Sequence, residues 1–153
     1  MCSGVEVRIG DRTSKIYYQT AMAALPVKLP GAGALEWIIW GRRKGEAGSS
    51  PQGGWARLST IDLGTWEVLQ PIRAQAIVER FMQNQGSAGL RGRRLSQWIE
   101  VPLGMAIECL VVGEGQNRRA YVITTTPPPK YKWARDHWPL LGEVEEWLAQ
   151  EAP

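Results

Sequence analysis

The feature that most constrains the fold is a series of short β-forming runs, each ended by Gly or Pro. Seventeen Gly and ten Pro are spread through the 153 residues. Short runs rich in Val, Ile, Thr, Tyr and Trp between such turn residues are typical of β-strands. They lie at residues 6–9, 35–40, 75–78, 98–101, 106–112 and 120–125. The sequence therefore predicts a β-rich chain.

Turn-forming residues indicate how some of these runs connect. Residues 105–112 and 119–125 flank Gly-Glu-Gly-Gln-Asn, a pattern that predicts a β-hairpin. The Gly- and Ser-rich segments 45–54 and 86–92 are expected to be mobile surface loops.

One helix is predicted near the end of the chain. Over residues 143–150, Val144, Trp147 and Leu148 follow the i, i+3, i+4 spacing of an amphipathic helix. We therefore predict an α+β fold in one domain over residues 1–153. It is β-rich, with mixed and antiparallel sheets around a core and with peripheral helices.

Charge and tryptophan content bear on the class of partner. The net charge is +3, and the basic residues cluster in three short runs, at 42–44, 91–94 and 118–119. Together these runs raise the expectation of a nucleic-acid partner modestly. The chain also has eight Trp. We expect most of them in the core, although an exposed indole also stacks on unpaired bases.

Cysteine and histidine content narrows the class of site. Cys2 and Cys109 are too few for a disulfide scaffold, and Cys109 lies in an apolar run typical of a core. His137 is the only histidine, so no zinc-ligand cluster is expected. Apolar stretches are too short to cross a bilayer. We expect a cytoplasmic protein with no metal, no cofactor and no membrane contact.

Several short motifs follow one another in a recognisable order. The chain begins Met-Cys, and Trp40-Gly41-Arg42 comes at the end of a predicted strand. Residues 55–60 read Trp-Ala-Arg-Leu-Ser-Thr, and residues 121–125 form a later strand. This order resembles the SOS response-associated peptidase family. That family has Met-Cys, a strand ending in Trp-Gly, an Asn-Ala-Arg-x-Glu-Thr segment, and a strand before its catalytic-histidine loop.

The rest of the chain extends the resemblance. Residues 73–83 are similar to the family's strand that begins with Arg and ends in Gly-Phe-Tyr-Glu-Trp. Asp136 and Pro139 fit its His-Asp-Arg-Met-Pro loop, and Trp147-Leu148 fits its final helix. Three positions differ: where the family has the Asn, the Glu and the His that assist its cysteine, this chain has Trp55, Gln83 and Arg135. The chain is thus similar to a divergent, phage-type member.

The resemblance implies chemistry at Cys2. Removal of Met1 gives Cys2 a free α-amine beside its thiol, with ordinary pKa values of about 7.7–8.0 and about 8.5. The amine condenses with the aldehyde of an open abasic sugar, and the thiol closes the Schiff base to a thiazolidine. The family resemblance implies that this ring shields abasic sites in single-stranded DNA. We expect Cys2 at the mouth of an Arg-lined groove.

The resemblance also suggests roles for the residues around Cys2. Gln83 hydrogen-bonds but cannot take a proton, and Arg135 stays charged, so His137 is the candidate base. Candidate contacts to DNA phosphates are Arg42, Arg57 and Arg73. Trp40 and Trp55 are candidates for stacking on bases beside the lesion.

Three functions remain open on the sequence. The first is the Cys2-dependent crosslinker of abasic single-stranded DNA. The second is a relative that binds the strand but has lost catalysis. The third is a thiol peptidase in which Cys2 needs a histidine base within hydrogen-bond reach. Whether the chain is an enzyme therefore depends on Cys2 and His137.

Overall fold

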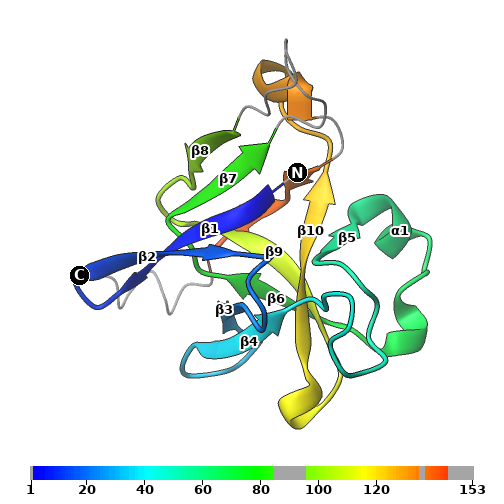
Figure 1. The fold of residues 1–153 in the computed structure, drawn as a ribbon. Helices are drawn as coiled ribbons and strands as arrows, with labels where there is room; N and C mark the ends of the chain where they lie inside the picture. The colour runs from blue at the N-terminus through cyan, green and yellow to red at the C-terminus, as the bar shows by residue number, and fades with distance from the viewer. Residues whose placement is uncertain (1, 85–95, 135–136, 145–153) are drawn as a thin grey trace.

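The central feature of the computed structural model is a closed barrel (Figure 1). The structure describes residues 2–84, 96–134 and 137–144. Within them, β9 pairs both with β6 and with β10, which closes the ring. Around the barrel the strands are β10 (Arg119–Thr125), β4 (Glu36–Trp40), β3 (Ala24–Lys28), β6 (Ile72–Ala76) and β9 (Met105–Val112). Neighbours are antiparallel except β10 and β4, which are parallel.

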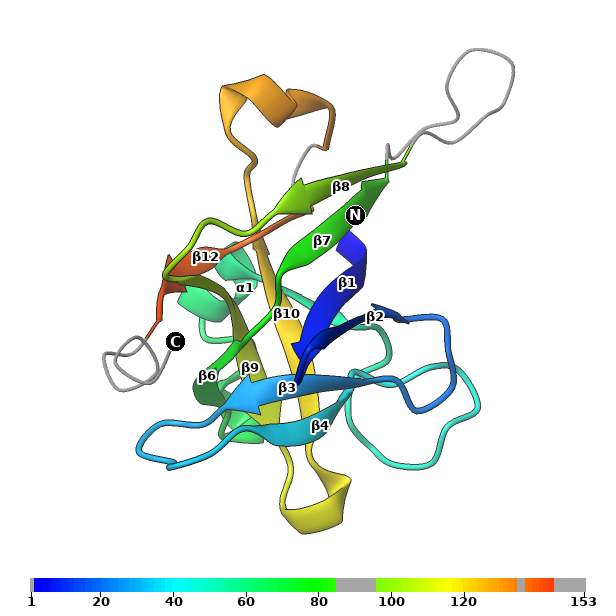
Figure 2. The ribbon, with the colours of Figure 1, turned by 90° about the vertical axis from the view of Figure 1, so that its left-hand side faces the viewer.

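A second, antiparallel sheet packs against the barrel. Its order is β2 (Arg12–Tyr17), β1 (Cys2–Ile9), β7 (Arg80–Asn84) and β8 (Ser96–Glu100). Its inward side chains, such as Val5 and Phe81, belong to the same buried cluster as Val27 of β3 and Val122 of β10. The second sheet therefore shares one core with the barrel (Figure 2).

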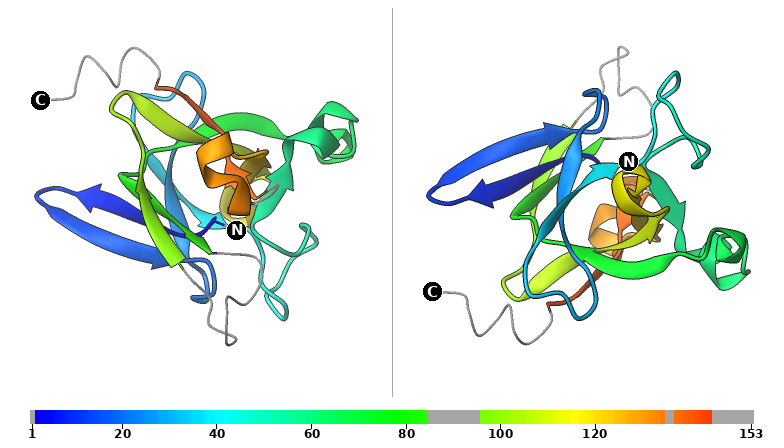
Figure 3. Two further views of the ribbon diagram at one scale, coloured as in Figure 1. Left: turned by 90° about the horizontal axis from the view of Figure 1, so that it is seen from above. Right: turned by 90° about the horizontal axis from the view of Figure 1, so that it is seen from below.

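Side chains alternate between two cores along β9 and β10. Cys109 and Val122 belong to the cluster shared with the second sheet. Leu110 and Tyr121 belong to another cluster on the outer face of the barrel. That face is covered by α1 (Leu58–Asp62), η1 (Glu67–Leu69) and nearby apolar side chains. Because both faces are buried, these two strands are almost continuously apolar. Figure 3 shows α1 and the β1–β2 hairpin on opposite sides of the molecule.

Three short strands bring further segments to the barrel edges. β5 (Trp55–Arg57) runs parallel to β10, and β11 (Trp138–Pro139) pairs antiparallel with the end of β10. β12 (Leu141–Glu143) pairs antiparallel with β9. β10 is thus the strand beside which both β5 and β11 lie.

The β-rich prediction is confirmed, and so is the hairpin formed by β9 and β10. Helix is scarce in the part of the chain that the structure describes. α1 has five residues, and the 3-10 segments are η1, η3 (Gly115–Asn117) and η4 (Pro129–Ala134). The α+β label is therefore only loosely supported. The predicted helix over 143–150 is wrong at its start, where Glu143 ends β12; residues 145–150 lie outside the described residues.

The segment 45–54, which we expected to be a mobile loop, is tied down by its own polar groups. Glu46 accepts hydrogen bonds from the main-chain N–H of Arg43 (2.9 Å), from Arg43 Nε (2.8 Å) and from the N–H of Met22 (3.1 Å). The side-chain hydrogen bond from Arg43 is the main reason that the pKa of Glu46 falls to about 2. The other expected loop, 86–92, lies outside the described residues.

Gly41 joins β4 to this loop, and a substitution there measures how tightly the loop is packed. Its φ is +58°, and a Cβ there would lie 2.1 Å from the carbonyl oxygen of Gly53. Left-handed backbone costs an L-residue about 1–2 kcal/mol, and the clash adds to that cost. We expect Gly41→Ala to lower the free energy of unfolding by at least about 3 kcal/mol, measured by urea denaturation.

Gly31 provides the matched control. Its φ is +73°, but a Cβ there meets nothing within 4 Å. Gly31→Ala should therefore cost only the conformational part, about 1–2 kcal/mol. Equal costs for the two substitutions would show that the loop yields at Gly53.

Candidate functional site

Cys2 and Gln83 lie side by side on neighbouring strands of the second sheet. Cys2 begins β1 and lies directly opposite Gln83 of β7. Directly opposed residues of antiparallel strands have Cβ atoms about 4.5–5.5 Å apart on the same face of the sheet. The pairing therefore places both side chains together on the inward face.

A β-bulge at Ser3 decides which way Cys2 points. The register shifts between Cys2 and Gly4, which leaves Ser3 as an extra residue. Strict alternation would put Cys2 on the opposite face from Val5. Because of the bulge, both side chains lie in the shared core.

Two side-chain hydrogen bonds complete the cluster around Cys2. Trp55 Nε1 donates to the main-chain oxygen of Cys2 at 2.6 Å. Gln83 Nε2 donates to the main-chain oxygen of His137 at 3.2 Å. Residues of β1, β5 and β7 and the main chain of His137 therefore meet at one place.

The side chain of Cys2 is fully buried, with 0 % of its surface exposed. The expectation that Cys2 lies at the mouth of a groove is therefore wrong in the chain that keeps Met1, because the bulge turns the residue into the core. Its Sγ lies 3.9 Å from the carbonyl oxygen of Gly4. Burial raises the pKa of the thiol from 9.0 to about 12. The thiol is therefore protonated at neutral pH.

Gln83 is equally buried, and only one of the two polar atoms of its side-chain amide has a hydrogen-bond partner among the described residues. Its side chain is 0 % exposed, and its Oε1 has no hydrogen-bond partner among the described residues. A buried acceptor without a donor costs roughly 1–3 kcal/mol. Such an atom, on the face that also carries Cys2, marks a place where a donor would be stabilised.

The histidine segment reaches the cluster through its main chain. His137 is half-buried, its N–H donates to the oxygen of Ala134 at 3.3 Å, and its own oxygen accepts from Gln83. Arg135 lies outside the described residues.

The two candidate tryptophans differ in exposure. Trp40 is 0 % exposed, and its Nε1 donates to the oxygen of Gly54 at 2.9 Å, so no ring face is open to a base. Trp55 is half-buried and packs against Tyr18, with ring centroids 4.8 Å apart. Tyr18 was not singled out in the sequence, where nothing but its aromatic character marks it.

The three candidate arginines lie in different surroundings. Arg57 is exposed and follows Trp55 by two residues, so both project from the same face of β5. The guanidinium of Arg42 donates to the main-chain oxygens of Ser50 (2.5 Å) and Glu46 (3.1 Å) within its loop. Arg73 lies on the outer face of the barrel, 3.8 Å from Glu108. Of the three, only Arg57 lies on the strand that also carries Trp55.

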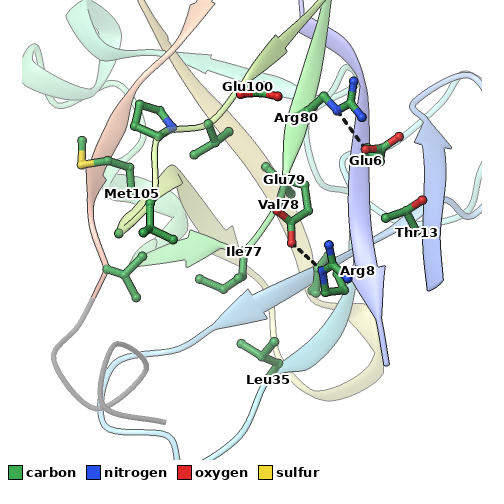
Figure 4. Close-up of a pocket in the computed structure, with 16 residues that line it drawn as sticks. Glu6, Arg8, Thr13, Leu35, Ile77, Val78, Glu79, Arg80, Glu100 and Met105 are labelled. Atoms are coloured by element: carbon green, nitrogen blue, oxygen red, sulfur yellow. Dashed lines mark hydrogen bonds and ion pairs between the residues drawn. The ribbon is translucent and has the colours of Figure 1, made fainter. Parts of the chain in front are cut away.

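Two cavities in the described structure are separate from the cluster. One of about 380 Å³ is lined by Arg57, Ser59, Asp62 and hydroxyls of residues 124–126. The other, of about 820 Å³, lies at the far end of the second sheet (Figure 4). Its charged wall holds the ion pairs Arg80–Glu6 (3.0 Å) and Arg8–Glu79 (3.1 Å). Cys2 and Gln83 line neither cavity.

The described residues contain no group of three or more His, Cys, Asp or Glu side chains that could hold a metal ion. In the same part of the chain, no helix is long and apolar enough to cross a membrane. Comparisons with family models, with curated proteins and with solved structures find no match for this chain.

The raised pKa of Cys2 predicts a stability effect at alkaline pH. The folded chain keeps a thiol proton that the unfolded chain loses, because the pKa is about 12 when folded and 9.0 in the ordinary state. The stability contributed by Cys2 is thus complete below about pH 9 and is lost as the pH rises towards 12. We expect the cost of Cys2→Ala to shrink by about 2 kcal/mol between about pH 8.5 and 10.5, measured by urea unfolding.

Val7→Ala is the matched control, since Val7 is a fully buried, non-titrating residue of the same strand. Its cost should not change over this range of pH. If the costs of the two substitutions change by the same amount, the pKa of the Cys2 thiol is not raised, and the thiol is in contact with solvent.

Proposed function

We propose that this chain binds single-stranded DNA and, once Met1 is removed, traps abasic sites through Cys2. The observation that carries the proposal is the meeting of Cys2, Gln83, Trp55 and the His137 segment at one place. These four positions are far apart in the sequence. They are also the positions, or next to the positions, at which the family resemblance puts the reactive cysteine and its helpers.

The proposed reaction balances without any redox partner. The α-amine of Cys2 attacks the aldehyde carbon of the open sugar, and loss of water gives a Schiff base. The thiol sulfur then adds to the same carbon, and the thiol proton passes to the nitrogen. The product is a thiazolidine ring and one water molecule.

Gln83 is suited to hold the amine rather than to exchange protons with it. Its Oε1 is a buried acceptor without a partner among the described residues, and a terminal ammonium or amine is a donor. An amide cannot act as acid or base. We therefore assign Gln83 the binding of the Cys2 amine, with Arg57 as the contact to a backbone phosphate.

Burial of the thiol favours some functions over others. A thiol peptidase needs a thiolate and a nearby histidine base, and the raised pKa of Cys2 works against the first. The crosslinking reaction starts at the α-amine of Cys2, which is free only after Met1 is removed. Full burial of Cys2 in the chain with Met1 favours the binding-only relative as the second candidate.

Cys2 variants test the crosslink. Protein freed of Met1 by methionine aminopeptidase is incubated with a single-stranded oligonucleotide that carries one abasic site. We expect a covalent band on a denaturing gel without added reductant. Cys2→Ala and Cys2→Ser should both abolish it, since each lacks the thiol that closes the ring; only borohydride should then trap a Schiff base.

The controls separate the candidates. Protein that keeps Met1 has its α-amine on Met1, which carries no thiol to close the ring, and should not form the band without reductant. A stable band from Cys2→Ala would show that another residue reacts. If the Met1-free protein binds the oligonucleotide but never crosslinks, the binding-only function is correct.

Arg57→Ala tests the DNA contact. Each phosphate contact on a single strand contributes about 0.7 to the slope of log affinity against log salt. We expect Arg57→Ala to weaken binding of a single strand and to lower that slope by about this amount, measured by fluorescence anisotropy. Arg12→Ala removes the same charge from an exposed position of β2 and should leave the slope unchanged. Equal effects of the two substitutions would mean that only net charge matters.

A further inference from the structure

A hydrogen bond from Trp55 to Cys2 joins the end of β1 to the barrel. Trp55 Nε1 lies 2.6 Å from the oxygen of Cys2. Trp55 belongs to β5, which runs beside the central residues of β10. The bond therefore connects the first peptide group after Cys2 to a strand held by the barrel.

A second tie fixes the next peptide group. The main-chain N–H of Tyr18 donates to the oxygen of Ser3 at 3.0 Å. Two successive carbonyl groups, those of Cys2 and Ser3, thus accept hydrogen bonds from two aromatic residues that pack against each other. Since Ser3 is the bulged residue, these ties hold the backbone where it leaves the regular ladder.

The indole of Trp55 is itself held in place. Its ring packs against Tyr18 at 4.8 Å and against Trp40 at 6.2 Å between centroids. Tyr18 is held in turn by Arg43, whose guanidinium lies over the Tyr18 ring, 4.6 Å from its centre. Arg43 also donates to the oxygen of Tyr18 at 2.7 Å and to Glu46 at 2.8 Å. Arg43, in the loop after β4, therefore holds Tyr18 in place, and the Tyr18 ring packs against Trp55.

We propose that Trp55 is a positioning residue for Cys2, which it holds by its indole N–H so that the aminothiol stays opposite Gln83. The assignment differs from the base-stacking role expected from the sequence, because the indole N–H is bound to Cys2 and the ring packs against Tyr18 and Trp40. It rests on the aminothiol chemistry of the proposed function but not on DNA binding.

The test uses Trp55→Phe, which keeps an aromatic ring and removes the N–H. The rate of thiazolidine formation is measured by intact-mass spectrometry on Met1-free protein. The probe is a small free aldehyde, glyoxylate, so that DNA binding does not enter. We expect Trp55→Phe to react about tenfold more slowly, on the order of the value of one hydrogen bond. Its affinity for an intact single strand should not change.

Trp66→Phe is the matched control. Trp66 is also half-buried, its Nε1 donates to Thr60 Oγ1 at 3.1 Å, and its ring packs against Tyr121 at 5.1 Å. It belongs to the other core, on the outer face of the barrel. Trp66→Phe should cost similar stability and leave the rate of the aldehyde reaction unchanged.

A second readout separates positioning from general loosening. Release of the chain end should expose the thiol, so Trp55→Phe should make Cys2 react faster with iodoacetamide while it forms thiazolidine more slowly. Trp66→Phe should change neither rate. An unchanged rate of thiazolidine formation in Trp55→Phe, or an equal loss in Trp66→Phe, would overturn the positioning role. If wild-type protein reacts with glyoxylate but never with abasic DNA, the proposed function fails and the positioning role stands.

Discussion

The pairing of Cys2 with Gln83 across β1 and β7 is the interaction on which the candidate site depends. It is a backbone constraint, because antiparallel register sets which side chains share a face. The bulge at Ser3 then shifts Cys2 by one position, so that it joins the inward residues and not the outer face. A single extra residue thus places Cys2 among the inward side chains, opposite Gln83, whose Oε1 has no partner among the described residues. The same bulge removes the thiol from solvent. The position of Cys2 opposite Gln83 and its burial therefore have the same origin.

β10 gathers the remaining parts of the site. It pairs with β9 and β4 within the barrel and accepts β5 and β11 as further neighbours along its length. Trp55, which precedes β10 in the sequence, and His137, which follows it, are therefore both placed by strands that pair with β10. The end of β1 is then joined to this assembly by side-chain and main-chain hydrogen bonds. The barrel supplies a rigid wall, while Cys2 itself lies at the end of a strand.

Sequence patterns located the strands that follow simple rules and missed those that do not. The runs at 106–112 and 120–125 are apolar because both faces of β9 and β10 are buried, and they were predicted. β2 is mostly exposed, and β3 contains Pro26, so neither has the expected composition. The resemblance brought Cys2, Gln83 and Trp55 forward as candidates, and they do lie together. The burial of Cys2, the bond from Trp55 and the bracing by Tyr18 could not be predicted, because they depend on a bulge and on long-range packing.

The most direct test of the account is to find which atoms of the protein carry an abasic sugar. Met1-free protein is incubated with the abasic single strand, digested with nuclease and protease, and analysed by peptide mass spectrometry. We expect a sugar remnant on the peptide that begins at Cys2, with a mass unchanged by borohydride because the thiazolidine ring is saturated. A remnant on a lysine or on Cys109, an adduct that borohydride reduces, or an unmodified Cys2 peptide would contradict it.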